Sequence, residues 1–356
     1  MTVVNVKDLQ EGDVLKNDLF RGGTLVLKSG TSLTKAVISK LRQWDIPSVD
    51  IRSAQDEHHV SDENEQETNV VNNSPDSVPS VSEIKNDFFN NLLKIGQEYR
   101  YGFALNDAVD YQWLEGLFIK FMSTGKIYKL LEKLKDWDYN TYQHSFDVFI
   151  LGTLFAKKLK IDDIEQFAIG CLLHDVGKLE IPKSILDKSS KLSQQEYETV
   201  KNHTIYGYKI LKQQDFPEYV ANLAKSHHER VEGSGYPEGL KNAEIKEEIK
   251  ALAIVDVYSA LMMARPYRHA YGSTVAETIL LKECKMVEDY YFYTFFRMLD
   301  IFPLNAIVEL TTGIHAKVID TNDKVPFYPV LEDRYKSNRI EMPLDRSVKI
   351  KKIIRF

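Results

Sequence analysis

Helical spacing of apolar residues over most of the chain is the feature that most constrains its fold. Across residues 81–299, apolar side chains recur at intervals of three and four, which is typical of helices that bury one face. Residues 193–196 (SQQE) have the form of an N-terminal capping box, and residues 162–165 (DDIE) open another helix. Residues 248–263 are apolar on most sides, so we expect this helix to be central. The sequence therefore predicts a mainly α fold.

The two ends of the chain predict small units that contain strands. Residues 1–53 hold a helix expected from Ser32 onward between two strand candidates, Thr24–Leu27 and Ser48–Ile51, which favours a small α/β module. Beyond Pro303 the apolar period shortens to two, which predicts a small β-rich C-terminal tail. Its expected strands are 307–310, 316–319 and 348–350. The predicted divisions are the module 1–53, a linker 54–82, a helical lead-in 83–137 and a helical domain 138–356 with its β-like tail from about 303.

The net charge of -6 comes from one segment of the chain. The protein has 46 basic and 52 acidic residues, but residues 54–82 contain seven acids and neither Lys nor Arg. This segment has no aromatic residue and no apolar period, so we predict a disordered linker. The remainder is close to neutral, which argues against a broad basic surface for DNA.

Other sequence features indicate a cytoplasmic protein that does not enter the membrane. Its two cysteines, Cys171 and Cys284, are too few for a disulfide scaffold. The N-terminus lacks the basic and apolar regions of a signal peptide. The longest apolar stretch, Val148 to Ala156, is far shorter than the roughly 20 residues that span a bilayer.

Five histidines and two acids inside the helical region are candidate metal ligands. Asp256 lies in the middle of an apolar helix, where an acid costs several kcal/mol unless it is paired or bound to a metal. Taken alone, His174-Asp175 is a core histidine beside a capping acid, and His227-His228 is a polar helix terminus. Taken together, the candidates suggest one shared site. They are His144, His174, Asp175, His203, His227, His228 and Asp256.

The chemistry of these side chains favours two divalent ions. Imidazole nitrogens with carboxylates suit iron, manganese or zinc and not calcium. Seven ligands are too many for one ion, but they can be divided between two around a shared Asp175. Pairs of ions about 3.5–4 Å apart are used to cleave phosphoesters. The loop Gly233–Pro237 follows the His pair. Beside a metal site, its Tyr236 is expected to line a substrate pocket and stack on a base. Taken alone, the loop is a tight turn without a function of its own.

Four motifs in order resemble the HD-GYP family, a branch of the HD phosphohydrolases. They are HDVGK (174–178), His203, HHERVEGSGYP (227–237) and DVYSALMMARPYR (256–268), and the resemblance covers roughly residues 138–330. It implies an HD-type helical bundle that holds two or three metals, usually iron or manganese, with zinc, nickel or cobalt as substitutes in vitro. It also implies a bacterial phosphodiesterase that opens cyclic di-GMP to pGpG and, in many members, continues to GMP.

Carried over by position, the resemblance assigns a role to each residue. His144, His174, Asp175 and Asp256 would bind the first metal, and Asp175 would bridge to a second held by His203, His227 and His228. Lys178 would contact the scissile phosphate or assist the leaving oxygen, although without this context it is a solvated side chain or a helix-dipole partner. The substrate side would include Gly235, Tyr236, Pro237, Ser259, Arg265 and Arg268, the two arginines gripping phosphates.

Two departures from the family pattern affect the expected product and rate. Asn140 stands where members with three metals have a Glu, so we expect two metals and a product that includes pGpG. Ser259 replaces the second Asp of the usual DVxDAL, at a position expected nearer to the substrate than to the metals.

Other functions and partners stay open from the sequence. The alternatives are a non-catalytic cyclic di-GMP receptor and an HD phosphohydrolase acting on another cyclic dinucleotide. The resemblance also implies a homodimer through the helical region. It likens residues 1–53 to a leader module, which acts as a packing or dimer-forming cap or as a ligand sensor.

Overall fold

The computed structural model describes most of the helical region and parts of both ends of the chain. The described residues are 2–10, 12–17, 19–21, 24–27, 30–31, 33, 37–38, 41, 46–52, 78–95, 104–105, 108–262, 288–321, 328–335, 338–342, 348 and 350–355. They form two compact units. One holds residues 1–77 with 106–108, and the other holds residues 78–105 and 109–356.

The N-terminal unit contains two short antiparallel strand pairs, as its sequence pattern suggested. Strand β1 (Thr2–Asn5) pairs with β4 (Ser48–Ile51), and β2 (Leu19–Arg21) pairs with β3 (Thr24–Leu27). Both predicted strands are therefore confirmed. Of the helix expected from Ser32 onward, the described residues 37–38 and 41 are helical, whereas Leu33 is not. The core consists of Val6, Leu9, Leu15, Leu27, Leu33, Val37, Ile38, Leu41 and Val49.

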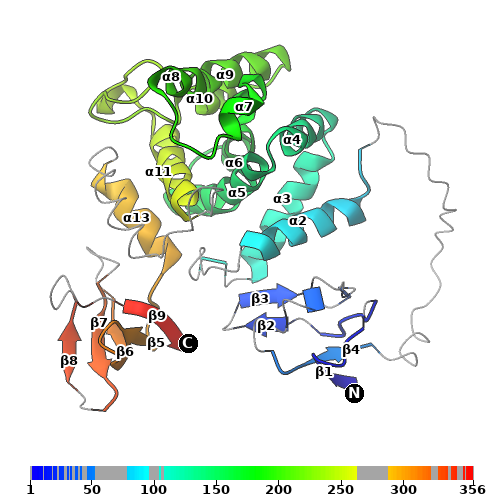
Figure 1. The fold of residues 1–356 in the computed structure, drawn as a ribbon, viewed down its shortest axis with the longest axis vertical. Coiled ribbons are helices and arrows are strands. Elements are labelled where there is room, and N and C mark those ends of the chain that lie inside the picture. Colours follow the sequence, from blue (N-terminus) through cyan, green and yellow to red (C-terminus); the bar gives the residue numbers. More distant parts are fainter. Residues whose placement is uncertain are drawn as a thin grey trace, which may run out of the picture. The chain divides into compact units, whose positions relative to one another are not determined.

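The second unit is a bundle of helices joined to a small sheet (Figure 1). Its helices are α2 (Val81–Ile95), α3 (Ala108–Met122), α4 (Gly125–Trp137), α5 (Tyr139–Leu159), α6 (Ile164–Leu173), α7 (Lys183–Leu186), α8 (Gln194–Lys201), α9 (His203–Gln213), α10 (Glu218–Ser226), α11 (Glu247–Met262) and α13 (Asp289–Leu299). Two 3₁₀ helices, η3 (Val176–Glu180) and η4 (Asn242–Glu244), lie between them. The predicted mainly α fold is confirmed.

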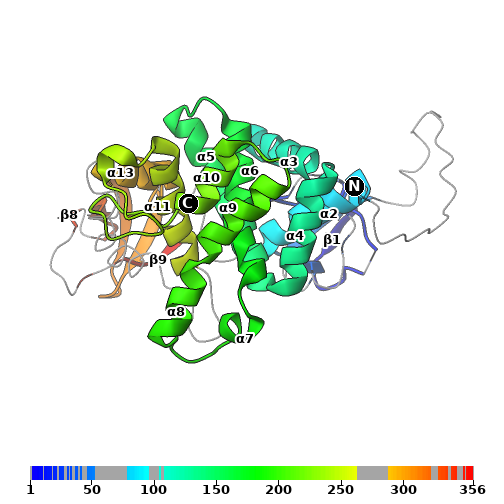
Figure 2. The same ribbon diagram turned by 90° about the horizontal axis from the view of Figure 1, so that it is seen from above.

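Helix α5 is the centre of the bundle. It packs against α4, α6 and α11, while α10 packs against α6 and α9, so these helices enclose one core (Figure 2). Most of α5 is buried from Thr141 to Ala156, which explains why its sequence is apolar on nearly every side. The Asp138 side chain caps its first turn by accepting from the N–H of Asn140, and Lys160 ends it in the left-handed conformation.

The predicted lead-in packs into the same compact unit as the rest of the bundle. The Phe88 ring of α2 lies 5.5 Å from the Phe118 ring of α3 and 5.4 Å from the Phe146 ring of α5. The hydroxyl of Tyr142 on α5 donates to Asp87 Oδ2 on α2 at 2.6 Å. Helices α2 and α3 therefore share a core with the helix that carries His144.

Two local boundaries differ from the sequence expectation. The linker predicted to end at Ser82 ends earlier, because Ser80 and Glu83 cap each other's backbone N–H groups and α2 already begins at Val81. Most of the predicted linker, residues 54–77, lies outside the described residues. The capping box at Ser193 and Glu196 is confirmed, but the helix that it opens ends at Lys201, and His203 begins a new helix.

The C-terminal residues form a five-stranded antiparallel sheet in the order β8-β7-β6-β5-β9. Strands β5 (Ile307–Leu310) and β6 (His315–Asp320) match the predicted positions, and β9 (Ile350–Arg355) begins where the third predicted strand was expected to end. Strands β7 (Val330–Asp333) and β8 (Arg339–Glu341) complete the sheet. Alternate residues such as Val308, Leu310, Ala316 and Val318 are buried on one face. Among the helices described, none is both long and apolar enough to cross a membrane.

Candidate metal centre

The fold brings all seven predicted ligands together from five helical segments. His144 lies inside α5 and Asp256 inside α11, whereas the others lie at helix ends. His174 caps the C-terminus of α6 and is followed at once by Asp175, which precedes η3. His203 begins α9, and His227 and His228 follow α10. Six of the seven are buried, and the His228 side chain is partly exposed.

Asp175 lies between two groups of ligand atoms. Its Oδ2 is 3.4 Å from His174 Nε2 and 3.9 Å from His144 Nε2. Its Oδ1 is 3.3 Å from His203 Nε2 and 3.9 Å from His227 Nε2. Each carboxylate oxygen therefore faces a different set of imidazoles, which is the arrangement that a bridging ligand requires.

The first group joins His144 and His174 to Asp256. Asp256 Oδ1 lies 2.9 Å from His144 Nε2 and 3.8 Å from His174 Nε2. The Nε2 atom of His174 is buried and makes no hydrogen bond with any described residue. A buried polar atom without a hydrogen bond is costly in a protein interior, and one that faces two carboxylates suits a cation. This group consequently fits a divalent ion.

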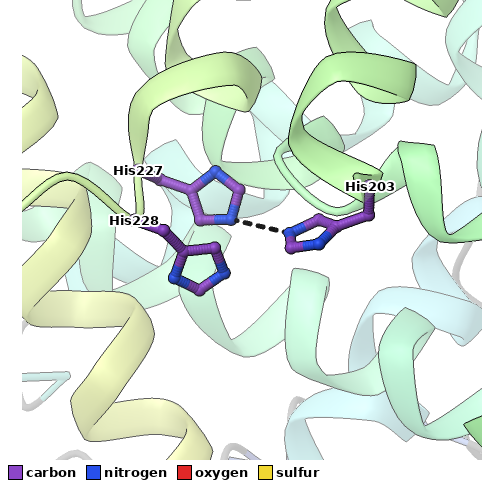
Figure 3. Close-up of side chains that lie close together, drawn as sticks. All are labelled: His203, His227 and His228. Atoms are coloured by element: carbon purple, nitrogen blue, oxygen red, sulfur yellow. Dashed lines mark hydrogen bonds between the residues drawn. The ribbon is translucent and has the colours of Figure 1, made fainter. Parts of the chain in front are cut away.

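The second group consists of His203, His227 and His228, whose rings converge from two elements (Figure 3). The Nδ1 atoms of His203 and His227 each lie within hydrogen-bonding distance of a backbone carbonyl, which can only accept, so Nδ1 carries the proton. Burial lowers the pKa of His203, and it lowers the pKa of His227 to about 3, so both rings are neutral at pH 7. Their Nε2 lone pairs then face each other across 3.3 Å. Two lone pairs at that distance repel unless a cation lies between or beside them.

The carboxylates of the centre stay ionised in spite of their burial. Burial raises the pKa of Asp175, but the charge of Lys178 and the His174 imidazole outweigh it and hold that pKa well below its usual value. Burial also raises the pKa of Asp256, but its close contact with the His144 imidazole outweighs burial and holds that pKa well below the usual range. Two negative groups together with the surrounding imidazoles form a donor set that is suited to divalent transition metals.

A close contact at Gly177 allows His203 to reach Asp175. Gly177 lies in η3, directly after the HD pair, and η3 packs on α9. A Cβ atom at this position would lie 1.9 Å from the carbonyl oxygen of His203 and 2.4 Å from the backbone N of Gly207. The glycine of HDVGK is therefore required by backbone packing that positions a ligand of the second group.

The GSGYP loop supports His228. The Tyr236 ring stacks on the His228 ring with centroids 4.7 Å apart, and Lys201 Nζ lies 5.5 Å from the Tyr236 centroid. A Cβ at Gly235 would meet the backbone N of Arg230 at 2.4 Å, so only glycine fits there. Pro237 follows Tyr236 through a cis peptide bond. The Tyr236 ring is in contact with the candidate metal ligand His228. The base-stacking role expected for Tyr236 therefore stays a prediction.

A cavity of ≈830 Å³ opens beside the first group of ligands. Its walls include His144 and Lys178, together with Asn140 at the start of α5 and Tyr197 on α8. Lys178 Nζ lies 2.6 Å from Asp175 Oδ2, and its side chain is 20% exposed, so the ammonium group lies between the bridging carboxylate and the cavity. This volume is within the range of cavities that bind small molecules.

Of the residues predicted to bind substrate, one lies away from the cavity and two lie outside the described residues. Ser259 was expected near the substrate, but its side chain is fully buried behind His144, where its Oγ contacts His144 Nδ1 and Asp147. Burial in the helix packing of α5 and α11 keeps it from the cavity. Arg265 and Arg268 lie outside the described residues.

Two residues of the site escaped the sequence reasoning. Asp147 is a fully buried acid among apolar residues of α5, which is the same signal that singled out Asp256. Glu229 is also buried and accepts from the N–H groups of Glu238 and Leu240, which shapes the GSGYP loop. No local pattern distinguishes Glu229 from the exposed acids around it, since its partners are backbone groups of a folded loop.

The chain is similar in sequence to several known proteins. A cyclic di-GMP phosphodiesterase of Pseudomonas aeruginosa is 29% identical over 221 residues, covering 61% of this chain and 53% of that protein. A 3'3'-cGAMP-specific phosphodiesterase of Vibrio cholerae is 38% identical over 145 residues, covering 40% of this chain and 34% of that protein. Among solved structures, an HDG"Y"P protein from Bdellovibrio bacteriovorus matches with a TM-score of 0.43 and 15% identity, covering 83% of this chain and 97% of that chain.

The matched segment spans about half or less of the length of these two curated relatives. Residues 132–288 match the family model described as HD domain, and this range contains all seven residues of the centre. Through these residues the chain is similar to the HD domain family.

Proposed function

We propose that this protein is a metal-dependent phosphodiesterase that hydrolyses cyclic di-GMP to pGpG, and then in part to GMP. The observation that carries the proposal is the bridging geometry of Asp175, whose two oxygens face separate groups of buried imidazoles. A single structural ion would need only four of these side chains. Seven converging ligands beside an open cavity favour a catalytic two-metal centre.

The first ion would be held by His144, His174, Asp175 and Asp256, and the second by Asp175, His203, His227 and His228. When bound, a pair of divalent ions polarises a phosphoryl oxygen and makes water a stronger nucleophile at neutral pH. The donor set favours iron or manganese, with zinc, nickel or cobalt as substitutes in vitro. Asn140 also lines the cavity, and its neutral amide is a poor ligand for a third ion.

Lys178 is suited to act on the scissile phosphate. Its ammonium group reaches from the bridging carboxylate to the cavity, so it can neutralise a phosphoryl oxygen or donate a proton to the leaving oxygen. Lys191 on the cavity wall adds positive charge around an anionic dinucleotide, whereas Lys188 is paired with Glu196. Arg265 and Arg268 are proposed to bind its phosphates.

Metal content and turnover test the proposal together. The protein is purified without oxygen, bound iron and manganese are counted, and the hydrolysis of cyclic di-GMP and 3'3'-cGAMP is followed by chromatography. We expect two ions per chain and faster turnover of cyclic di-GMP, with pGpG as the first product. Nucleotide binding without turnover by the fully loaded protein would contradict the enzyme and indicate a receptor.

The hybrid dinucleotide is a second candidate substrate, because a relative with 38% identity is specific for 3'3'-cGAMP. Faster turnover of 3'3'-cGAMP in the same assay would replace cyclic di-GMP as the preferred substrate. Because both substrates are intracellular messengers, we propose a cytoplasmic location. We also propose a homodimer, which light scattering of the full chain tests.

Replacing Lys178 with alanine tests its proposed role in the chemical step. The Lys178→Ala variant should lose about 10²–10³-fold in kcat, as when one donor to a developing oxyanion is removed. Metal content should stay at two ions, because Lys178 is not a ligand. The control is Lys209→Ala, an exposed lysine on α9 whose loss should leave kcat unchanged. A wild-type kcat for Lys178→Ala would remove this lysine from the mechanism.

A further inference from the structure

His144 is oriented differently from the other imidazoles of the centre. In three histidines, the ring lies within hydrogen-bonding distance of the backbone carbonyl three residues earlier. Each of these carbonyls is in the last turn of a helix, where a carbonyl has no N–H partner within the helix. The contacts from Nδ1 are 2.8 Å for His174 with Cys171, 2.6 Å for His203 with Val200 and 2.9 Å for His227 with Ala224. Helix ends therefore orient these three rings without help from another side chain.

No such carbonyl is open to His144, because it is the sixth residue of α5 and its neighbours belong to the helix ladder. Its Nδ1 instead lies 2.9 Å from the Oγ of Ser259 on α11. Ser259 Oγ in turn donates to Asp147 Oδ2 at 2.5 Å. His144 is 5% exposed, and Ser259 and Asp147 are fully buried, so water does not compete for these contacts.

When Asp147 is a carboxylate, the three residues are hydrogen-bonded in one direction. A carboxylate accepts and does not donate, so the hydroxyl proton of Ser259 points to Asp147. Ser259 Oγ then accepts from His144 Nδ1–H, which leaves the lone pair of His144 on Nε2. That Nε2 lies 2.9 Å from Asp256 Oδ1, also an acceptor, in the first group of ligands. Two acceptors at this distance are stable together when a cation binds both.

We propose that Asp147 and Ser259 are positioning residues for the first metal, acting as a carboxylate–hydroxyl–imidazole relay that holds His144 as an Nε2 donor. This inference rests on the proposed metal-dependent function. In the motif that this chain resembles, an Asp occupies position 259; here the carboxylate comes from Asp147 on α5, and Ser259 connects it to the ring. Asp147 lies three residues after His144, on the same face of the helix.

The relay makes a quantitative prediction for metal binding. Partners that orient a metal-bound histidine contribute about 10–100-fold to metal affinity. Ser259→Ala and Asp147→Asn should each weaken binding of one of the two ions by that factor and leave the other ion unaffected, because His203 and His227 are oriented by backbone carbonyls. The measurement is a cobalt titration of the full chain, followed by visible absorption, which reports both affinity and ligand geometry.

A double variant distinguishes positioning from simple packing. Asp147→Asn with Ser259→Asp moves the carboxylate next to His144 and should restore cobalt affinity to within a few fold of wild type, with the wild-type spectrum. The matched control is Ser145→Ala, a fully buried serine beside His144 whose Oγ makes no hydrogen bond, and it should bind both ions as wild type does.

Two results would overturn the relay. One is wild-type affinity for both ions in Ser259→Ala and Asp147→Asn. The other is a double variant as weak as Asp147→Asn in a protein with wild-type circular dichroism, which would show that Asp147 matters only for packing. Because no nucleotide is present, an inactive but metal-binding protein would contradict the proposed activity and leave this inference standing.

Discussion

Replacing Asp175 with alanine is expected to remove both bound ions together and to lower kcat/KM for the cyclic dinucleotide by about 10³-fold or more. The physical reason is the position of its two oxygens, which lie within 3.3–3.9 Å of imidazoles in both groups. A metal ion contributes several kcal/mol to stabilising the transition state, and each 1.36 kcal/mol is tenfold in rate. Loss of a shared ligand should therefore cost more than loss of one histidine.

Metal content and thermal unfolding measure this effect without substrate. An ion that binds only the folded state at 100 times its Kd stabilises it by about 2.7 kcal/mol, so manganese should raise the melting temperature of the wild type and not of Asp175→Ala. The control is Asp162→Ala. Asp162 is an exposed acid just before the N-terminus of α6, and this variant should retain both ions. Two ions and wild-type turnover in Asp175→Ala would show that this carboxylate is not the bridge.

Gly177→Ala is expected to destabilise the protein by about 3 kcal/mol and to weaken metal binding in the second group. The added methyl would meet backbone atoms of His203 and Gly207, which cannot rotate away as a flexible side chain can. The contact between η3 and α9 must then open, and His203 moves away from Asp175. Calorimetric unfolding of the metal-free and manganese-loaded protein measures both consequences.

Gly116→Ala is the matched control. Gly116 lies inside α3, where an added Cβ has nothing within 4 Å, so alanine should stabilise the helix by roughly 0.5–1 kcal/mol. We therefore expect Gly177→Ala to lower the free energy of unfolding and Gly116→Ala to raise it. If Gly177→Ala unfolds at the wild-type temperature and keeps both ions, the close backbone contact does not position His203.

Local sequence patterns were sufficient for most of the fold. The capping residues Ser193 and Asp163 begin helices as expected, because their side chains satisfy N–H groups of the first turn within four residues. The break between Lys201 and His203 was not predicted, since apolar spacing continues through it. The helix that begins after this break packs on η3, a contact between segments that are not adjacent in the chain.

The residues of the candidate site also divide into those that the sequence could identify and those that only the structure places. Asp256 was found because a lone acid in an apolar helix signals an unusual partner, and Asp147 could have been found by the same argument. Ser259 could not have been placed by that means, because a serine is tolerated in a core when its hydroxyl has a partner. Only the crossing of α5 and α11 shows that its hydroxyl connects Asp147 to His144.

The sequence alone predicted the seven candidate ligands and the helical class of the fold, since residue type and helical period are local properties. The tertiary structure decided how those ligands are shared, because the division depends on which oxygen of Asp175 faces which imidazole. It also decided how four of the five rings are oriented, by a helix-end carbonyl in three cases and by a side-chain relay for His144. Distances of a few ångströms between atoms on different helices are set by packing, and no pattern along one chain encodes them.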